Sequence, residues 1–265
     1  MKNENTVNVM NTLYIPLYGK YYTTKRNIII SDPTAVKIWE DNPVPLKGKS
    51  KNKYLAFFMS VRAKVFDDYV NEMISRYGDD LIIIHPGCGL DGRIGRVDSE
   101  GILWYDIDLE YVTTERKKYF TEDEYYKIIP SDVRELDMNI FPKGKTAVVI
   151  MEGLSMYIEN EDVRNLFGKL SSHFEKLHIL SDFYSVKAAK LSKYRNPIND
   201  VGVYDVYGLD DPYILENGVR FVREHSMVPE KYRNMIPGTE GFIFRHLYCS
   251  DFALSLYRIF EYEKV

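Results

Sequence analysis

The sequence predicts an α/β fold in which helices cover both faces of a mostly parallel β-sheet. Short apolar, β-branched runs such as 81–84 and 146–151 are typical of strands buried on both faces. Helical patterns alternate with these runs through the second half of the chain, which favours parallel strands joined by crossover helices. A glycine-rich turn follows the first of these strands, at the kind of position where open parallel sheets bind ligands.

The composition is that of a globular protein rather than a nucleic-acid-binding or membrane protein. The 265 residues are 45% hydrophobic, which suffices for a sizeable core, and we expect residues 1–265 to form a single domain. The formal net charge of -4 gives no basic field that would attract nucleic acid or anionic lipid. No apolar run approaches the roughly 18 residues of a membrane span, and the polar residues 1–6 lack the apolar core of a signal peptide. We therefore expect a soluble, cytoplasmic protein.

The two cysteines, Cys88 and Cys249, lie far apart in the sequence. They provide neither a disulfide framework nor a set of metal ligands, so we expect no bound metal. This cysteine usage suits a reducing cytoplasm.

The first 78 residues, 1–78, predict a helical cap that precedes the sheet. Asp32 before Pro33 is typical of a helix start, and residues 54–77 carry apolar side chains at helical intervals. Arg62 lies within the apolar stripe of that helix rather than opposite it. Because a buried charge needs a counter-charge, we expect Arg62 to pair with an internal carboxylate or with the carboxylate of a ligand.

The glycine turn has the sequence His85-Pro-Gly-Cys-Gly-Leu-Asp-Gly-Arg93. Gly87 and Gly89 allow a sharp turn and a close approach by a ligand, as in nucleotide-binding turns. Such a turn is followed by a helix and, about 20 residues later, by an acid that accepts hydrogen bonds from ribose hydroxyls. Residues 93–97 can begin the helix, and Asp108 ends the next strand 19 residues beyond Gly89.

Residues 79–265 form the predicted core. The strands are expected at 81–84, 102–108, 125–129, 146–151, 176–182, 219–223 and 255–263. The helices are expected at 110–120, 159–174, near 239–250 and, as a short one, at 208–218. An insertion over about 185–208 follows the fifth strand, and its early part is expected to be helical. The last strand alternates polar and apolar residues, which predicts an antiparallel strand at the edge of the sheet.

An acid follows each of four consecutive parallel strands: Asp91, Asp108, Asp132 and Glu152. Each alone could be a turn acid or a helix cap, but the carboxyl ends of parallel strands meet at one edge, where ligands bind. Several carboxylates would repel a pyrophosphate and attract a cation. The charge balance therefore favours S-adenosylmethionine, which carries a sulfonium and an ammonium group and no phosphate, over NAD.

Four segments resemble the leucine carboxyl methyltransferase family: the glycine turn, Trp104–Asp108, Ser131–Val133 and Met151–Glu159. The opening Leu13–Lys20 and the later Gly208–Pro212 are closest to its bacterial branch, which includes polyketide-synthesis O-methyltransferases. The resemblance covers nearly the whole chain. It implies a class I methyltransferase fold, which is Rossmann-like and has seven strands with an antiparallel last strand, and it implies binding of S-adenosylmethionine.

The resemblance implies where the adenosyl part of the cofactor would lie. Gly87 and Gly89 would line the adjoining methionine part. Asp108 would hold the ribose hydroxyls, and Asp132 with Val133 would contact the adenine.

The resemblance also implies a set of residues around the methionine part. Lys20 and Arg62 would neutralise its carboxylate, and Glu152 would lie near its amino or sulfonium group. Cys88 and Asp91, within the glycine turn, complete the predicted cofactor-binding residues.

One position departs from the broader methyltransferase pattern. The acid that commonly precedes the glycine turn is replaced here by His85-Pro86. The sequence therefore leaves open which group meets the cofactor ammonium.

The methyl acceptor is expected to be a small molecule, with a carboxylate favoured over a hydroxyl. A carboxylate is ionised at neutral pH, so it needs alignment with the sulfonium and no general base, and we assign no catalytic residue. A hydroxyl acceptor would need a base, for which His85 is the candidate beside the turn. Tyr157 and Tyr204 are candidate residues of the acceptor site.

Three alternatives stay open on the sequence. The first is a hydroxyl O-methyltransferase of secondary metabolism. The second is an NAD-dependent oxidoreductase, since Gly92 stands at the third glycine of a G-x-G-x-x-G pattern. The third is a cofactor-binding module without catalytic turnover.

Overall fold

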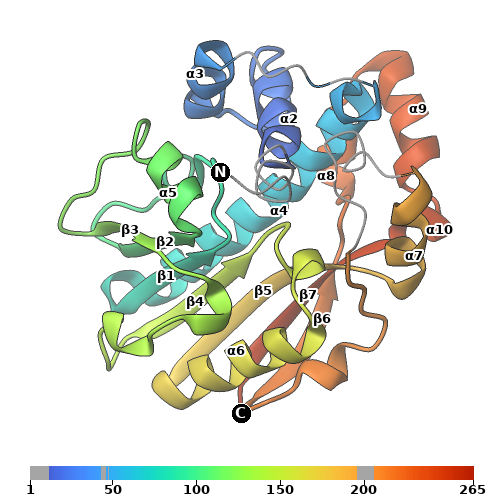
Figure 1. Ribbon diagram of the computed structural model, residues 1–265. Coiled ribbons are helices and arrows are strands. Elements are labelled where there is room, and N and C mark those ends of the chain that lie inside the picture. The colour runs from blue at the N-terminus through green and yellow to red at the C-terminus, as the bar shows by residue number, and fades with distance from the viewer. Residues whose placement is uncertain (1–11, 43–45, 47, 196–205) are drawn as a thin grey trace, which may run out of the picture.

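The computed structural model describes residues 12–42, 46, 48–195 and 206–265 (Figure 1). Within these residues seven strands form one sheet in the order β3-β2-β1-β4-β5-β7-β6. The strands are β1 (Leu81–Pro86), β2 (Leu103–Asp108), β3 (Tyr126–Pro130), β4 (Thr146–Met151), β5 (Lys176–Tyr184), β6 (Val219–His225) and β7 (Tyr257–Lys264). Strands β1 to β5 pair in parallel, whereas β7 runs antiparallel to both of its neighbours. The predicted α/β sheet with an antiparallel last strand is confirmed.

The last strand does not lie at the edge of the sheet, so that part of the prediction is wrong. Strand β7 is inserted between β5 and β6. Ile259, Phe260 and Tyr262 are fully buried, which means that both faces of β7 are covered. Glu261, a polar residue of the alternating pattern that predicted an exposed face, is buried as well. Arg223 of the neighbouring edge strand β6 pairs with it at 2.7 Å.

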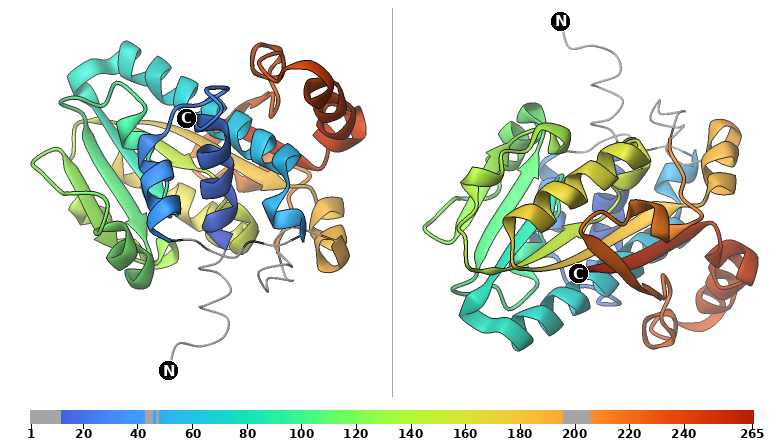
Figure 2. Two further views of the ribbon diagram at one scale, coloured as in Figure 1. Left: turned by 90° about the horizontal axis from the view of Figure 1, so that it is seen from above. Right: turned by 90° about the horizontal axis from the view of Figure 1, so that it is seen from below.

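Three helices precede the sheet: α2 (Tyr14–Thr24), α3 (Pro33–Asp41) and α4 (Lys53–Tyr77). Helix α4 runs across one face of the sheet, whereas α2 and α3 lie above the carboxyl ends of the strands, where α2 packs against both α3 and α4 (Figures 1 and 2). Asp32 caps α3 as predicted, since its carboxylate accepts a hydrogen bond of 2.8 Å from the amide of Ala35. Helices α2 and α4 pack closely, and a Cβ on Gly19 would lie 2.9 Å from that of Met59. This packing fixes the position of α2 relative to the sheet.

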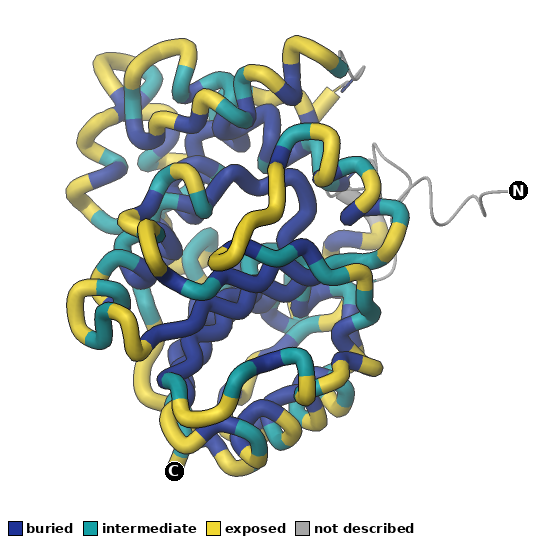
Figure 3. Tube along the Cα trace, turned by 90° about the vertical axis from the view of Figure 1, so that its left-hand side faces the viewer, coloured by how far each residue is buried: buried dark blue, intermediate teal, exposed yellow. Residues whose placement is uncertain are grey.

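The opposite face of the sheet is covered by α6 (Asn160–His173) (Figure 1). Its buried apolar side chains recur at helical spacing and are Val163, Leu166, Phe167 and Leu170. Successive residues of a strand point to opposite faces, so Ile83 packs toward the N-terminal helices and Ile82 toward the α6 side. Figure 3 shows the strands as a buried centre, with exposed residues on the outer sides of helices and in loops.

The remaining helices are α5 (Glu110–Arg116), α7 (Val186–Arg195), α8 (Glu230–Arg233), α9 (Gly238–Tyr248) and α10 (Asp251–Leu254). Helix α5 ends at Arg116 and not at residue 120. Residues 117–119 continue as turns, in which the amides of Tyr119 and Phe120 donate to the carbonyl of Arg116 and the buried guanidinium of Arg116 lies 3.9 Å from the ring of Phe120. Among the described residues, no helix combines the length and the apolar character needed to cross a membrane.

Candidate active site

A pocket of about 250 Å³ lies beyond the carboxyl ends of β1, β2 and β4. The structure brings all ten predicted cofactor-binding residues into its lining: Lys20, Arg62, Gly87, Cys88, Gly89, Asp91, Asp108, Asp132, Val133 and Glu152. Tyr157, one of the two predicted acceptor residues, lines it too, and Tyr204 lies outside the described residues. Several further lining residues have no site role predicted from the sequence, among them Leu13, Met59, Tyr111, Ser131 and Met156.

The glycine turn needs its glycines for conformation and for space. Gly87 and Gly89 have φ of +68° and +52°, in the left-handed region that side chains disfavour. A Cβ on Gly87 would lie 2.9 Å from Leu154, and one on Gly89 would lie 3.0 Å from Leu13. Substitution at either position would push these side chains into the pocket or distort the turn.

Asp108 lines the pocket beside the glycine turn. Its two carboxylate oxygens accept hydrogen bonds of 2.8 Å from the amides of Gly89 and Leu109. Burial raises the pKa of Asp108, and no cation among the described residues lies within ion-pair distance of it. Each oxygen keeps a second lone pair, so Asp108 can accept two hydroxyl donors from a ligand.

Asp132 is less buried than Asp108 and has its own partner. Its carboxylate caps the short turn Val133–Glu135 by accepting a hydrogen bond of 3.0 Å from the amide of Arg134. The guanidinium of Arg134 also pairs with it at 2.5 Å, and this hydrogen bond lowers the pKa of Asp132. Asp132 is therefore both a turn cap and a pocket residue.

The two predicted cation-facing acids, Asp91 and Glu152, are buried in ion pairs. Lys20 lies 3.0 Å from Asp91, and Arg62 lies 3.0 Å from Glu152. Arg93 binds both carboxylates. The pocket thus holds balanced charges rather than a ring of free carboxylates.

Arg62 pairs with internal carboxylates, which is the first of the two alternatives predicted for it. Its guanidinium bonds Glu152 and the hydroxyl of Tyr257, at 2.6 Å, and lies 3.4 Å from Asp182. Asp182 in turn accepts hydrogen bonds from Tyr257 and from the amide of Gly153. Because Arg62 also lines the pocket, it can reach a ligand carboxylate from this position.

Two arginines that sequence analysis did not identify as site residues hold this network together. Arg93 is fully buried and bonds Asp67 at 2.6 Å, and Arg96 bonds Asp67 and Asp91. Arg96 also reaches Asp32, the cap of α3, at 2.5 Å. The network therefore joins the N-terminal helices to the glycine turn.

No α-helix follows the glycine turn, so the predicted helix start at 93–97 is wrong. The chain makes one 3-10 turn, Arg93–Gly95, because the side chain of Arg93 is held in the buried network. A pyrophosphate-binding fingerprint relies on a helix N-terminus at this place. Gly92 has a separate reason to be glycine, since a Cβ there would lie 2.7 Å from an oxygen of Asp32. Both findings count against the NAD alternative.

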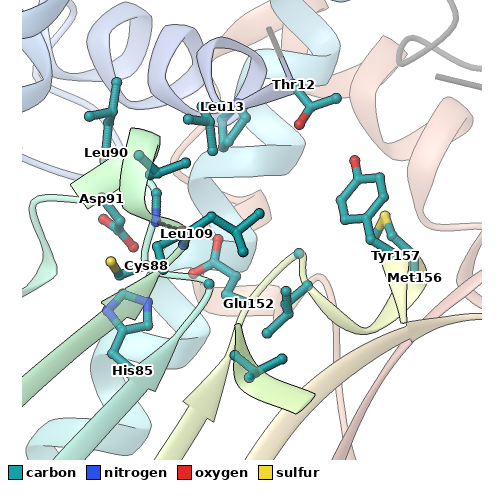
Figure 4. Close-up of a pocket in the computed structure, with 18 of the residues that line it drawn as sticks. Thr12, Leu13, His85, Cys88, Leu90, Asp91, Leu109, Glu152, Met156 and Tyr157 are labelled. Carbon is teal, nitrogen blue, oxygen red and sulfur yellow. Dashed lines mark hydrogen bonds between the residues drawn. The ribbon is translucent and has the colours of Figure 1, made fainter. Parts of the chain in front are cut away.

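The far end of the pocket is mostly apolar. Figure 4 shows Thr12, Met156 and Tyr157 on one side of the cavity, and His85, Cys88 and Asp91 on the other. Burial raises the pKa of the Tyr157 hydroxyl, which keeps it protonated and able to donate a hydrogen bond. Within the described ranges no three His, Cys, Asp or Glu side chains are placed to hold a metal ion.

Comparison with known proteins identifies the family. A model of the leucine carboxyl methyltransferase family matches residues 23–171, which is more than half of the chain. The chain belongs to the leucine carboxyl methyltransferase family. It is therefore an S-adenosylmethionine-dependent methyltransferase, as predicted.

Two curated relatives support this membership. The methyltransferase is 25% identical over 179 residues to the tetracenomycin polyketide synthesis O-methyltransferase TcmP of Streptomyces glaucescens, an alignment that covers 66% of each chain. It is 24% identical over 206 residues to the S-adenosyl-L-methionine-dependent methyltransferase dpfgK of Gibberella zeae, which covers 71% of this chain and 68% of the relative. The alignment thus spans just under two thirds of the first relative.

Solved structures confirm the fold. Magnesium protoporphyrin IX methyltransferase (ChlM) from Synechocystis PCC 6803 with bound SAH matches with a TM-score of 0.52 and 13% identity, over 88% of this methyltransferase and 95% of that chain. Geranyl diphosphate methyltransferase in complex with SAM matches with a TM-score of 0.53 and 15% identity, over 84% and 93%. The seven-stranded sheet is accordingly that of class I methyltransferases.

Proposed function

We propose that this methyltransferase transfers the methyl group of S-adenosylmethionine to a carboxylate oxygen of a small acceptor. The observation that carries the proposal is the chemistry of the pocket. Its apolar end offers hydroxyl donors, and the histidine among its described lining residues, His85, lies at the opposite end (Figure 4). Such a site suits an acceptor that is ionised already, because methyl transfer to a carboxylate needs no proton removal.

The described residues fit S-adenosylmethionine better than a phosphate-bearing cofactor. Asp108 offers two acceptor oxygens for the ribose hydroxyls, and Asp132 with Val133 flanks the place proposed for the adenine. The turn at Gly87 and Gly89 lets the backbone approach the methionine part closely. When bound, this cofactor supplies an electrophilic methyl group on a positively charged sulfur.

Lys20 and Arg62 are proposed to bind the cofactor carboxylate, although both are ion-paired. Asp91, the partner of Lys20, and Glu152, a partner of Arg62, each have a further cation. Asp91 keeps Arg93 and Arg96 if Lys20 turns to a ligand, and Glu152 keeps Arg93 if Arg62 does. The pocket-facing cations can therefore move to a ligand without leaving Asp91 or Glu152 unpaired, which would cost several kcal/mol. Asp182 would keep its hydrogen bonds from Tyr257 and from the amide of Gly153.

Tyr157 is proposed to hold the acceptor. Its protonated hydroxyl can donate a hydrogen bond to one carboxylate oxygen, while the other oxygen faces the methyl group. Met156 lies beside Tyr157 (Figure 4) and would contact the apolar body of the acceptor, together with Met59, which also lines the pocket. Because a tyrosine donor is neutral, it orients the carboxylate without the charge neutralisation that would weaken it as a nucleophile.

We also propose that residues 1–265 form one domain. The supporting observation is that one core cluster includes side chains from Ile15 in α2 to Ile259 in β7. The helical cap and the sheet thus share their buried surface.

The direct test is methyl transfer from methyl-labelled S-adenosylmethionine to a panel of small carboxylic acids and matched alcohols or phenols. We expect label in methyl esters, which mild base hydrolyses to labelled methanol. Base-stable label on hydroxyl acceptors alone would contradict the carboxylate proposal. Binding of S-adenosylhomocysteine without transfer to any acceptor would favour a non-catalytic module.

A further inference from the structure

His85 occupies the position where an acid commonly precedes the glycine turn. It lies in β1, and its side chain is only 2% exposed yet lines the pocket. In Figure 4 its ring lies close to Cys88 and Asp91, on the side of the pocket away from Tyr157. This is the end of the pocket proposed for the methionine part of the cofactor.

Asp106 fixes the protonation pattern of the His85 ring. It is the partner of His85 in the pairing of β1 with β2, and its Oδ1 lies 2.9 Å from His85 Nδ1. The same carboxylate accepts hydrogen bonds from Trp104, Tyr126 and Arg116. Although burial opposes ionisation, Arg116 and the hydrogen bond to His85 lower the pKa of Asp106 to about 2. An ionised carboxylate only accepts hydrogen bonds, so Nδ1 carries the proton.

The other ring nitrogen, Nε2, is consequently a hydrogen-bond acceptor in the neutral imidazole. It has no hydrogen-bond partner within the part of the chain that the structure describes. Because His85 lines the pocket, this acceptor is available to a hydrogen-bond donor of a ligand bound there. The acids nearby, Asp91 and Glu152, already bind lysine and arginine side chains.

We propose that His85 Nε2 accepts a hydrogen bond from the α-ammonium group of the cofactor. The carboxylate that commonly precedes the turn is absent from β1 in this arrangement. The negative charge lies instead on Asp106 of the neighbouring strand β2, and the imidazole of His85 connects it to the ammonium group. His85 is thus a cofactor-binding residue, which holds the methionine part in line with the acceptor. The inference rests on the proposed function, because it assumes that the cofactor lies in this pocket.

Two substitutions distinguish the role of Nε2 of His85 from the role of Nδ1. His85→Asn retains an amide near the Nδ1 position, which can still bond Asp106, and removes the Nε2 acceptor. His85→Gln presents its terminal amide oxygen near the Nε2 position. If His85 served only to pair with Asp106, the asparagine variant would bind ligand like the wild type.

The experiment measures binding of S-adenosylhomocysteine and of its analogue without the amino group, by isothermal titration calorimetry. We expect H85N to weaken S-adenosylhomocysteine binding by roughly 10- to 100-fold, as for loss of a hydrogen bond to a charged group. The deamino analogue should bind H85N within about threefold of wild type, and H85Q should retain most of the wild-type affinity for both ligands. Equal losses for both ligands, or no loss for either, would overturn the proposal.

A measurement on the wild-type protein keeps the proposal testable if the variants fail to fold. The chain has five histidines, so their ring ¹⁵N resonances can be assigned individually. The Nε2 resonance of His85 should shift on addition of S-adenosylhomocysteine and stay in place with the deamino analogue. A shift with both ligands, or with neither, refutes the contact. If the wild type binds neither ligand, the proposed function itself fails.

Discussion

Replacing Asp108 by alanine should abolish most of the affinity for the cofactor while leaving the fold intact. Asp108 offers one free lone pair on each oxygen beyond the hydrogen bonds to Gly89 and Leu109. Two hydrogen bonds from ribose hydroxyls to a charged acceptor are worth about 1.5–3 kcal/mol each, or about 3–6 kcal/mol together. We therefore expect S-adenosylhomocysteine to bind D108A about 10²- to 10⁴-fold more weakly.

The stability of D108A should change little, because two effects oppose each other. The substitution removes two hydrogen bonds to backbone amides, but it also removes a carboxylate whose burial raises its pKa and disfavours its charged form. We expect the free energy of unfolding in urea to stay within about 1 kcal/mol of the wild type. Asp132→Ala gives a comparison within the same pocket, because its carboxylate already pairs with Arg134 and its loss should weaken binding by less than about tenfold.

The raised pKa of Asp108 also gives a pH dependence. Ribose hydroxyls bond better to the ionised carboxylate, so wild-type affinity should fall as the pH is lowered through that pKa. D108A should lack this part of the pH dependence. An affinity of D108A within about threefold of the wild type would refute the assignment of Asp108.

Three further predictions concern the buried network and the turn. Arg62→Met removes the only cation that the described residues place beside the buried Asp182 and one of the two beside Glu152, so urea denaturation should show a loss of about 3–5 kcal/mol; a loss below about 1 kcal/mol would mean that the pairs contribute little. Burial raises the pKa of Asp182 to about 6, so its folded form binds a proton more tightly than its unfolded form and wild-type stability should fall as pH rises from about 4 to 6. Asp182→Asn should lack this pH dependence, so the free energy of unfolding of the wild type should fall by about 3 kcal/mol relative to that of the variant. Parallel pH profiles of stability for the two proteins would exclude the raised pKa of Asp182. Gly92→Ala should destabilise the protein by about 1–3 kcal/mol, because the new Cβ would lie 2.7 Å from Asp32; a wild-type melting temperature would show that this carboxylate can move away freely.

The sequence predicted the sheet well because the strands carry unambiguous patterns. The run over Thr146–Met151 is apolar throughout and forms a strand buried on both faces. The convergence of Asp91, Asp108, Asp132 and Glu152 on one pocket follows from parallel pairing alone, since the carboxyl ends of parallel strands share an edge.

The charge pairing in the site could not be predicted, because it depends on which side chains the fold encloses. Arginine is usually exposed, so nothing in the sequence marks Arg93 and Arg96 as buried partners of Asp91. Because these arginines pair with the acids, the pocket does not contain the expected ring of free carboxylates. The same pairing holds Arg93 in a 3-10 turn where an α-helix was expected.

The contact between His85 and Asp106 needed the strand register. The two residues are 21 positions apart, and periodicity predicts the two strands without fixing which residues face each other. The position of β7 inside the sheet was missed for a similar reason. An alternating pattern predicts one polar face, but the polar Glu261 is buried by partners from β6.

The most direct test of the account is a crystal structure of the full chain with S-adenosylhomocysteine. We predict that the ribose hydroxyls lie within hydrogen-bond distance of Asp108, that the adenine lies beside Val133, and that the methionine carboxylate reaches Lys20 or Arg62. A ligand bound elsewhere, or one in this pocket whose ribose makes no contact with Asp108, would contradict the account.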